Sequence, residues 1–386
     1  MRVNLPEERI KPKRFPPLND SRIMVFLSAL GLALMLAMVW HARGAAGGGV
    51  SDFAAFYAGA KLLEEGKLYD ADRLQQIELA HAGKYAPRHG YVRPPFHAAM
   101  VWPLSRLDYA RAALVWNALQ AAALLGFVVL WRRPRWEFTL LFTCISVPAF
   151  SGFINGQDGA FVLFFLALAV YLHRCGHPFM AGIALSLCAA KFHLFLPIPL
   201  WIVGQRAWRL GGGLVAGGTA LLLVSFLLAG WSWPLELYAS ATRPEFSPHP
   251  GLMPNLHGVL AAFPRGFWPE ILMSGGLALT TWLVARKTDF HYSLAFTLAC
   301  GLLLSYHAYV PDMVLLLPAG LTIVFASKLR VVRVLATVLL LPPAAFAVIL
   351  GSPTSAVTVS GVVLLLALMT YEALVQGADG MVSLPR

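Results

Sequence analysis

Three acidic residues, Asp52, Asp158 and Asp312, lie at the ends of predicted membrane helices, all on the same predicted side of the membrane. Asp52 comes shortly after the first apolar span. A charged side chain held at a bilayer is energetically costly and is usually functional. A carboxylate in this position could take a proton from the hydroxyl group of an acceptor molecule, which is general-base chemistry. We therefore treat Asp52 as the candidate catalytic residue.

Polar and basic residues from distant parts of the sequence share that predicted side. They are Arg93, His97, Asn155, Gln157, Lys191, His193, His257, Ser305, Tyr306 and His307. Polar residues gather in loops at any membrane face, yet random scatter would not favour one face. We expect these residues to converge on a single site. The predicted substrate-binding residues are Arg93, Lys191, His307, Gln157, Asp312 and His193.

Each acidic residue also has a structural interpretation. Asp52 is predicted in the first turn of a helix, where the helix dipole stabilises a negative charge, so it could be a terminal charge without chemistry. Asp158 precedes an apolar segment, and we expect it to cap the helix that follows. Asp312 starts another apolar segment, where capping and function are equally open.

The basic residues also allow more than one interpretation. Arg93 lies in a proline-rich turn and could bind a phosphate through its forked guanidinium group. Lys191 interrupts an apolar run. Snorkelling to the membrane surface explains a lysine at a helix end, and a phosphate partner explains it equally well. His307, in an aromatic stretch, could bind an anion, position a sugar or tune a carboxylate.

The elements that must position these residues are predicted to be membrane helices. The chain is 58% hydrophobic and 13% charged, with a mean hydropathy of +0.66, and a soluble protein could not bury that much apolar surface. We predict an all-α polytopic membrane protein with about 10–13 transmembrane helices. The apolar segments are 23–41, 110–131, 138–153, 159–172, 179–191, 193–204, 210–229, 267–285, 290–304, 311–326, 334–350 and 356–374. Those around Lys191 are shorter than the ~20 residues of a perpendicular span, which indicates broken or re-entrant helices.

The distribution of basic residues predicts the orientation of the chain. Short connections on one side carry Arg132, Arg133, Arg135, Arg174, Arg206, Arg209, Arg286, Lys287, Lys328, Arg330 and Arg333. By the positive-inside rule this side is cytoplasmic, together with the tail 1–22, and the candidate site faces outward. The net charge of +11 is then mostly anchoring charge. Nucleic-acid binding is excluded, because no soluble basic domain interleaved with aromatic residues is present.

We interpret residues 1–386 as one membrane domain with two outward loops. The first loop, 42–109, is predicted to hold a helix from Ser51 to Gly66 and another from Asp70 to Gly83. An apolar stretch, 96–107, then lies in or near the membrane interface. The second loop, 230–266, is rich in proline and aromatic residues, and its run 244–254 indicates a loop or lid.

Motifs that the sequence lacks narrow the chemistry. It has no glycine-rich phosphate loop, no His/Cys metal spacing and no Gly-x-Ser-x-Gly elbow. We therefore predict no cofactor and no metal, although sequence leaves open a metal held by Asp52 with other carboxylates. No connection on the basic side is long enough for a nucleotide-binding domain, so the donor of a transferred group would be a membrane lipid. Sugar transfer from a lipid phosphate needs a base on the acceptor and cations near the phosphate, and direct displacement would invert the anomeric centre.

Several motifs together resemble glycosyltransferase family 87. They are Ser51-Asp52-Phe53, Tyr57-Ala58-Gly59, Gly66-Lys67-Leu68-Tyr69-Asp70, Tyr91-Val92-Arg93-Pro94-Pro95, Asn155-Gly156-Gln157, the segment 181–185 leading to Lys191, and the run from Ser305 to Asp312. The resemblance implies a GT-C-type membrane fold and a polyprenyl-phosphate-mannose donor. It also implies that Asp52 is the catalytic base and that His307 lines the active site. Phe192 and Pro311 depart from residues common in the family.

The sequence therefore predicts an inner-membrane, multi-pass hexosyltransferase whose site faces outward. Its partners would be a polyprenyl-phosphate-linked sugar donor, a lipid or glycan acceptor and the bilayer. The main alternative is a transporter or flippase of a lipid-linked sugar or small solute, which would need polar residues along a route through the bilayer and similar halves. A catalytically inactive lipid-binding or assembly protein is a third possibility. The donor sugar, the acceptor, the linkage and the oligomeric state leave no readable mark in the sequence.

Overall fold

The computed structural model describes residues 21–46, 52–82, 90–131, 135–243, 249–261, 263 and 266–375. Within these ranges the chain is helical and contains no strand. The first helices are α1 (Ser21–Ala46), α2 (Asp52–Glu64), α3 (Ala71–Ala82), α4 (Pro95–Ser105), α5 (Tyr109–Leu130), α6 (Trp136–Cys144), α7 (Val147–Ile154), α8 (Gly159–Arg174) and α9 (Pro178–Ser186). Next come η1 (Leu187–Phe195), α10 (Ile198–Gln205), α11 (Trp208–Ala229), α12 (Trp233–Ala241), η3 (Pro250–Leu252) and α13 (Leu256–Leu260). The last are α14 (Phe267–Lys287), α15 (Phe290–Leu304), η4 (Val310–Leu315), α16 (Leu316–Ala326), α17 (Arg330–Leu340), α18 (Pro342–Ile349) and α19 (Thr354–Val375).

The helices confirm an all-α polytopic membrane protein. In the described part of the chain, five helical spans are long and apolar enough to cross a membrane, and seven if each bent pair counts as one span. Three shorter apolar helices, 159–174, 290–304 and 310–326, accompany them. The predicted segments 138–153 and 334–350 are each a bent pair, α6 with α7 at 60° and α17 with α18 at 56°. Prolines at the start of α7 and α18 account for the bends, because proline cannot continue the preceding helix.

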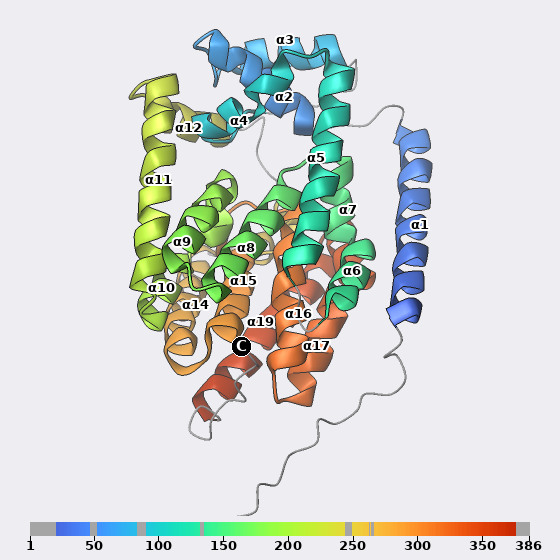
Figure 1. Cartoon of the computed structure of the whole chain (residues 1–386), viewed down its shortest axis with the longest axis vertical. Helices are drawn as coiled ribbons and strands as arrows, with labels where there is room; N and C mark the ends of the chain where they lie inside the picture. The colour runs from blue at the N-terminus through green and yellow to red at the C-terminus, as the bar shows by residue number, and fades with distance from the viewer. Residues whose placement is uncertain are drawn as a thin grey trace, which may run out of the picture.

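The spatial arrangement separates a small helical layer from a large bundle (Figure 1). Helices α2, α3, α4 and α12 lie together at one end of the molecule, at the top of the view. Helix α11 runs along one side and packs against α9 and α4, while α1 lies at the opposite edge against α6. In the centre, α15 is buried from Tyr292 to Leu303 and α16 from Leu316 to Ile323. A helix that is apolar on all sides belongs in such an interior.

The helices of the first predicted loop form where the sequence places them. After α2 the chain turns at Gly66, whose φ of +66° is a left-handed conformation that glycine adopts without strain. Helix α3 is capped by Asp70, whose Oδ1 accepts a hydrogen bond from the Arg73 backbone N–H at 3.1 Å. The predicted ends at Ser51 and Gly83 lie outside the described residues, as does most of the tail 1–22.

One predicted loop boundary needs correction. Helix α1 continues to Ala46, so the first outward segment begins later than residue 42. The second loop, 230–266, is largely helical in its described part, because it contains α12, η3 and α13. Of the predicted proline-rich loop 244–254, residues 244–248 lie outside the described ranges, and the rest includes the single 3₁₀ turn η3.

A close packing contact fixes the small layer onto the segment that leads into α4. The ring of Tyr91 lies so near Gly59 that a Cβ on that glycine would approach the ring to 2.4 Å. The Tyr69 hydroxyl donates to the backbone carbonyl of Arg93 at 2.9 Å. These contacts hold residues 91–94 against α2, so that Arg93 and Asp52 face a common space.

Candidate functional site

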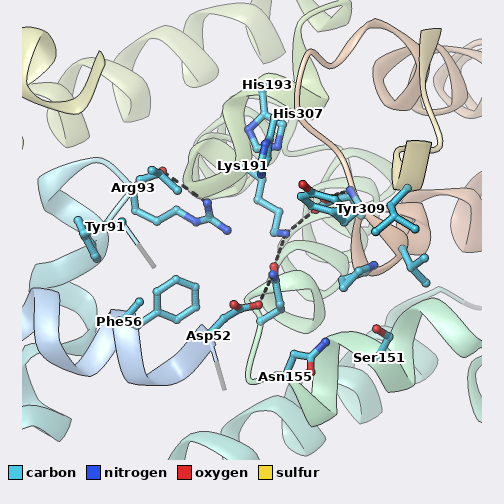
Figure 2. A pocket seen from close by; sticks show the side chains of 18 of the residues that line it. Asp52, Phe56, Tyr91, Arg93, Ser151, Asn155, Lys191, His193, His307 and Tyr309 are labelled. Atoms are coloured by element: carbon cyan, nitrogen blue, oxygen red, sulfur yellow. Dashed lines mark hydrogen bonds and ion pairs between the residues drawn. The ribbon is translucent and has the colours of Figure 1, made fainter. Parts of the chain in front are cut away.

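A cavity of about 430 Å³ is lined by residues of the small helical layer and of the bundle. All seven predicted site residues line it: Asp52, Arg93, Gln157, Lys191, His193, His307 and Asp312. They come from α2, the segment before α4, the turn after α7, η1 and the segment that ends in η4 (Figure 2). The fold therefore brings these residues to one place, as expected, while their roles remain predictions. The volume of the cavity is within the range of small-molecule sites.

The turn between α7 and α8 connects Asp52 to the interior of the site. Gly156 has a φ of +66°, which suits glycine and lets the chain reverse before Gln157. The Asp52 backbone N–H donates to the Asn155 carbonyl at 2.6 Å. The Gln157 side chain then bridges two charged groups: its Nε2 donates to Asp52 Oδ2, and its Oε1 accepts from Lys191 Nζ at 2.8 Å. Figure 2 shows this connection as dashed lines.

Lys191 lies at a break within a helical span. Its φ of −119° and ψ of 48° are not helical, and its side chain is only 2% exposed. Nζ lies 2.5 Å from Asp312 Oδ1 and 3.3 Å from Asp158 Oδ1. Nζ donates hydrogen bonds to Asp312 and to Gln157, and it forms an ion pair with Asp158. Lys191 therefore points inward to protein acceptors, and the snorkelling interpretation is wrong.

Asp158 is not the helix cap that the sequence suggested. Its side chain makes no capping hydrogen bond to α8 and is 2% exposed. Instead, Arg93 Nε donates to its Oδ2 at 3.0 Å and Nη2 donates to its Oδ1 at 3.4 Å, a two-pronged ion pair. Burial alone would raise the pKa of Asp158, but the charges of Arg93 and Lys191 outweigh burial and hold this pKa below its usual value.

His97 completes the surroundings of Asp158 from the side of α4. Its Nε2 lies 3.6 Å from Asp158 Oδ2, and its Nδ1 lies 3.1 Å from the Tyr91 hydroxyl. Burial lowers the pKa of His97 to about 4, against the opposing effect of the Asp158 charge. The imidazole is therefore neutral at physiological pH and acts as a hydrogen-bonding partner.

Asp312 caps a helix, as one interpretation of the sequence expected, and also forms an ion pair. Its Oδ2 accepts a hydrogen bond from the Tyr309 backbone N–H at 2.8 Å, which caps η4. Its Oδ1 pairs with Lys191. Capping therefore places this carboxylate where it can neutralise a buried cation.

Two histidines face the cavity beside Lys191 (Figure 2). The ring centroids of His193 and His307 are 6.4 Å apart. Within the described structure, His193 Nε2 is buried and has no hydrogen-bond partner. Burial lowers the pKa of His307, in spite of the nearby charge of Asp312, so this imidazole is neutral near pH 7. A buried ring nitrogen that has no hydrogen-bond partner and lies beside the charged side chain of Lys191 is suited to contact a polar ligand.

His257 does not join the site, although the sequence grouped it there. Its Nδ1 lies 3.2 Å from Glu270 Oε2, and its ring packs on Tyr306, with the centroids 4.2 Å apart. These three residues line a separate groove beside α14. The segment from Ser305 to Tyr309 therefore directs Tyr306 to one cavity and His307 to another.

The buried charges of the site balance one another, and one additional carboxylate lies at the cavity wall. Arg93, Lys191, Asp158 and Asp312 are buried and pair with one another, as buried ions must. Asp52 is half-buried at the cavity wall and adds a negative charge. In the described ranges, no group of three or more His, Cys, Asp or Glu side chains is arranged to hold a metal ion. The arrangement can supply a base, a guanidinium group and two imidazoles to one bound molecule.

Comparison with known proteins agrees with the motifs. Residues 91–318, more than half of the chain, match glycosyltransferase family 87. The chain belongs to this family. It is also 25% identical over 229 residues to a protein of Mycobacterium tuberculosis (strain CDC 1551 / Oshkosh), the polyprenol-phosphate-mannose-dependent alpha-(1-2)-phosphatidylinositol pentamannoside mannosyltransferase. This alignment covers 56% of the present chain and 50% of the relative, so the chain spans about half the length of that protein. No solved structure matches the chain.

Asp158 and His97 contact the residues of the site without lining the cavity, and the sequence analysis left both out of the functional set. The signal for Asp158 was its position directly after Gln157. A carboxylate at the start of a helix usually has a local explanation, and the partners that overrule it here, Arg93 and Lys191, lie 65 and 33 positions away in the sequence.

Proposed function

We propose that this protein is a membrane glycosyltransferase that moves a hexose, mannose in the first instance, from a polyprenyl-phosphate donor to a hydroxyl group of a lipid or glycan acceptor. The reaction takes place on the outer face of the cytoplasmic membrane. Membership of glycosyltransferase family 87 supports a glycosyl transfer, and the name of the mycobacterial relative supports the donor class. The alternative from another class is a transporter of a lipid-linked sugar.

The observation that carries the proposal is the arrangement of Asp52 opposite nitrogen-bearing side chains in one cavity. Asp52 and Arg93 lie on the side formed by the small helical layer, while His193 and His307 lie near Lys191 (Figure 2). A sugar phosphate bound between them would have its reacting carbon near a carboxylate and its phosphate near N–H donors. Charge that develops on a leaving phosphate is stabilised by donors fixed in advance.

The proposed reaction is a direct displacement. Asp52 accepts the proton of the acceptor hydroxyl while the acceptor oxygen forms a bond to the anomeric carbon. The bond between that carbon and the phosphate oxygen breaks, and the electron pair leaves with the polyprenyl phosphate. One bond forms and one breaks on opposite faces of the sugar, so the configuration inverts.

The hydrogen-bonding capacity of each cation decides its role. Lys191 Nζ already donates to Gln157 and Asp312 and forms an ion pair with Asp158. We therefore assign Lys191, with Asp312, to holding the site together. A guanidinium group has five N–H donors, so Arg93 can hold Asp158 and still donate to a phosphate. His193 and His307 complete the phosphate and sugar contacts, and Gln157 holds Asp52 in position.

The test is sugar transfer by the purified full-length protein in proteoliposomes. Radiolabelled polyprenyl-phosphate mannose is the donor, and a membrane extract supplies acceptors. Replacing a general base costs about 100- to 10,000-fold in rate, and we expect a loss of this size for Asp52→Asn. The matched control is Asp70→Asn, because Asp70 belongs to the same helical layer but caps α3 away from the cavity lining.

Three outcomes separate the proposals. Transfer by the wild type and by Asp70→Asn, but not by Asp52→Asn, supports both the enzyme and its base. Transfer by all three proteins keeps the enzyme and removes Asp52 as the base. If no protein transfers any of several polyprenyl-linked sugars but labelled donor crosses the bilayer in a protein-dependent manner, the transporter alternative replaces the proposal.

A further inference from the structure

The groove beside α14, which the proposed chemistry does not use, is a second cavity of about 710 Å³. We call it the α14 groove. Its described lining includes His257 and Leu260 of α13, the residue Tyr306, and Phe267 and Glu270 of the first turn of α14. The volume of the α14 groove is within the range of small-molecule sites.

Two short segments of the chain contribute to both cavities. The segment that holds η3 and α13 places Leu252 in the candidate site and His257 in the α14 groove. The segment after α15 places His307 in the candidate site and Tyr306 in the α14 groove. The two cavities are therefore neighbours that share these segments.

The buried side chain of Asn255 ties the two segments together. Its Oδ1 accepts a hydrogen bond from the Gly258 backbone N–H at 2.7 Å, and its Nδ2 donates to the Ser305 carbonyl at 2.6 Å. Both Asn255 and Ser305 are buried. Because buried and satisfied polar groups make a structure rigid, a ligand in the α14 groove would be held at a fixed position relative to His307.

Exposed aromatic rings border the α14 groove. Tyr306 is 64% exposed and Phe267 is 65% exposed. Aromatic side chains at a membrane surface often anchor a protein among lipid headgroups. The neighbouring Trp268, which is 65% exposed and is not a lining residue of the groove, fits that interpretation. Tyr306 and Phe267 differ from Trp268 because they border a cavity that also contains polar side chains.

The polar side chains of the α14 groove are His257 and Glu270. Their Nδ1 and Oε2 atoms are 3.2 Å apart, and the two side chains are 18% and 25% exposed. The Tyr306 ring packs on the imidazole, with the centroids 4.2 Å apart. A carboxylate can accept several hydrogen bonds, so Glu270 can hold His257 and still accept hydrogen bonds from a ligand.

This combination of groups suits a neutral molecule that has both C–H and O–H groups. One face of a sugar ring carries C–H groups that can pack on the negative face of an aromatic ring. The hydroxyl groups of the sugar can donate to a carboxylate in charge-assisted hydrogen bonds. The charge of Glu270 disfavours a second anion, such as a lipid phosphate.

The α14 groove lies at the end of α14 that is opposite to its basic residues. The last turn of α14 carries Arg286 and Lys287, which the positive-inside rule assigns to the cytoplasm. In the proposed orientation, Glu270 in the first turn therefore lies on the outward side. A glycan acceptor would approach the protein from that side.

We propose that the α14 groove is a binding site for a neutral saccharide and holds sugars of a glycan acceptor that do not react. The inference rests on the proposed function in its choice of a glycan acceptor. The saccharide packs on the rings of Tyr306 and Phe267 and donates hydrogen bonds to Glu270. Another sugar of the same glycan enters the neighbouring candidate site.

The test is an NMR titration of the full-length protein, in lipid nanodiscs without glycolipid, with the soluble probe mannotriose. We expect Glu270→Gln to weaken mannotriose binding at least about tenfold, because a hydrogen bond to a charged group is lost. We expect Phe267→Ala to weaken binding about threefold or more, because a packing face is lost. The matched control is Trp268→Ala, since Trp268 and Phe267 are equally exposed and only Phe267 lines the groove.

Several results of the titration overturn the proposal. One is absence of mannotriose binding by the wild type, and another is unchanged binding in both groove variants. An equal loss in Trp268→Ala also overturns it, because the aromatic residues would then act only as membrane anchors. Loss of binding in Asp52→Asn, with both groove variants unaffected, would place the saccharide in the candidate site. Binding of dihexanoylphosphatidylcholine in place of mannotriose would make the groove a lipid-headgroup site.

The titration involves no turnover, so its failure leaves the proposed glycosyl transfer intact. The transfer assay adds a second readout. Glu270→Gln should raise the KM for an acceptor lipid that carries three mannose residues at least about tenfold and leave kcat unchanged, because only acceptor binding is lost. A fall in kcat with an unchanged KM would assign Glu270 to the structure of the site and would overturn the proposal.

Discussion

Two buried carboxylates, Glu372 on α19 and Asp158 before α8, show how differently this protein uses the same group. Their exposed fractions are nearly equal, 3% and 2%. Glu372 accepts hydrogen bonds from the Tyr292 hydroxyl at 2.8 Å, the Ser327 hydroxyl at 2.6 Å and the Lys328 backbone N–H at 2.6 Å. These bonds tie α15, α19 and the connection after α16 to one another.

Asp158 is held instead by cations that also line a cavity. Arg93 and Lys191 each have one face towards Asp158 and another towards the space beside Asp52. The comparison shows that burial of a charge does not by itself indicate function. The Asp158 group differs because its partners, Arg93 and Lys191, also line a cavity large enough for a ligand.

The largest expected effect is the loss of stability when Asp158 is replaced. Asp158→Asn leaves Arg93 and Lys191 buried with one carboxylate fewer, and removal of one member of a buried ion pair costs about 3–5 kcal/mol. We expect a loss of this size in the unfolding free energy of the detergent-solubilised protein, measured by chemical denaturation. Asp108→Asn is the control: Asp108 forms an exposed pair with Arg111, so its loss should cost less than about 1 kcal/mol. Equal effects at the two positions would contradict the interpretation.

A smaller effect is expected when the other carboxylate is made neutral. Glu372→Gln keeps an acceptor for Tyr292 or Ser327 but loses the charge that strengthens these hydrogen bonds, and we expect a loss of about 1–3 kcal/mol. Activity per folded molecule should not change, because Glu372 holds helices and not substrate. Thermal unfolding and transfer assays on the same preparation check both statements. A fall in kcat of the fully folded variant would show that the surroundings of Glu372 and the Asp158 group are coupled.

The third effect appears only in acid and concerns the response of the Asp158 group to pH. The pKa of His97 is about 4 in the folded protein and 6.5 in an unfolded chain. Between these values the unfolded chain binds a proton that the folded protein does not, so stability is full above pH 6.5 and is lost as the pH falls towards 4. His97→Gln should flatten this part of the curve of unfolding temperature against pH. An equally steep decline in the variant would assign the acid sensitivity to other groups.

The sequence predicted local features well and long-range partners poorly. The glycine stop at Gly66, the cap at Asp70 and the break at Lys191 each depend on neighbouring residues, and the structure contains all three. Convergence of the seven predicted residues followed from topology, since helix ends on one face of a membrane meet. The role of Asp158 could not be predicted, because its partner Arg93 lies 65 positions away and only the tertiary fold brings the two together. The prediction that His257 joins the site was wrong for the same reason. Residues predicted on one face of the membrane can line different cavities.

The pairing of Lys191 with Asp312 also has a consequence for biosynthesis. These residues are 121 positions apart, and Asp52 meets Gln157 over 105 positions. During translation Lys191 enters the membrane long before its second carboxylate has been made. A nascent or truncated chain that ends before residue 312 therefore has an incomplete charge network, even though most of its helices are present. Under the proposed function, unfinished copies that end before residue 312 would be unable to consume lipid-linked sugar.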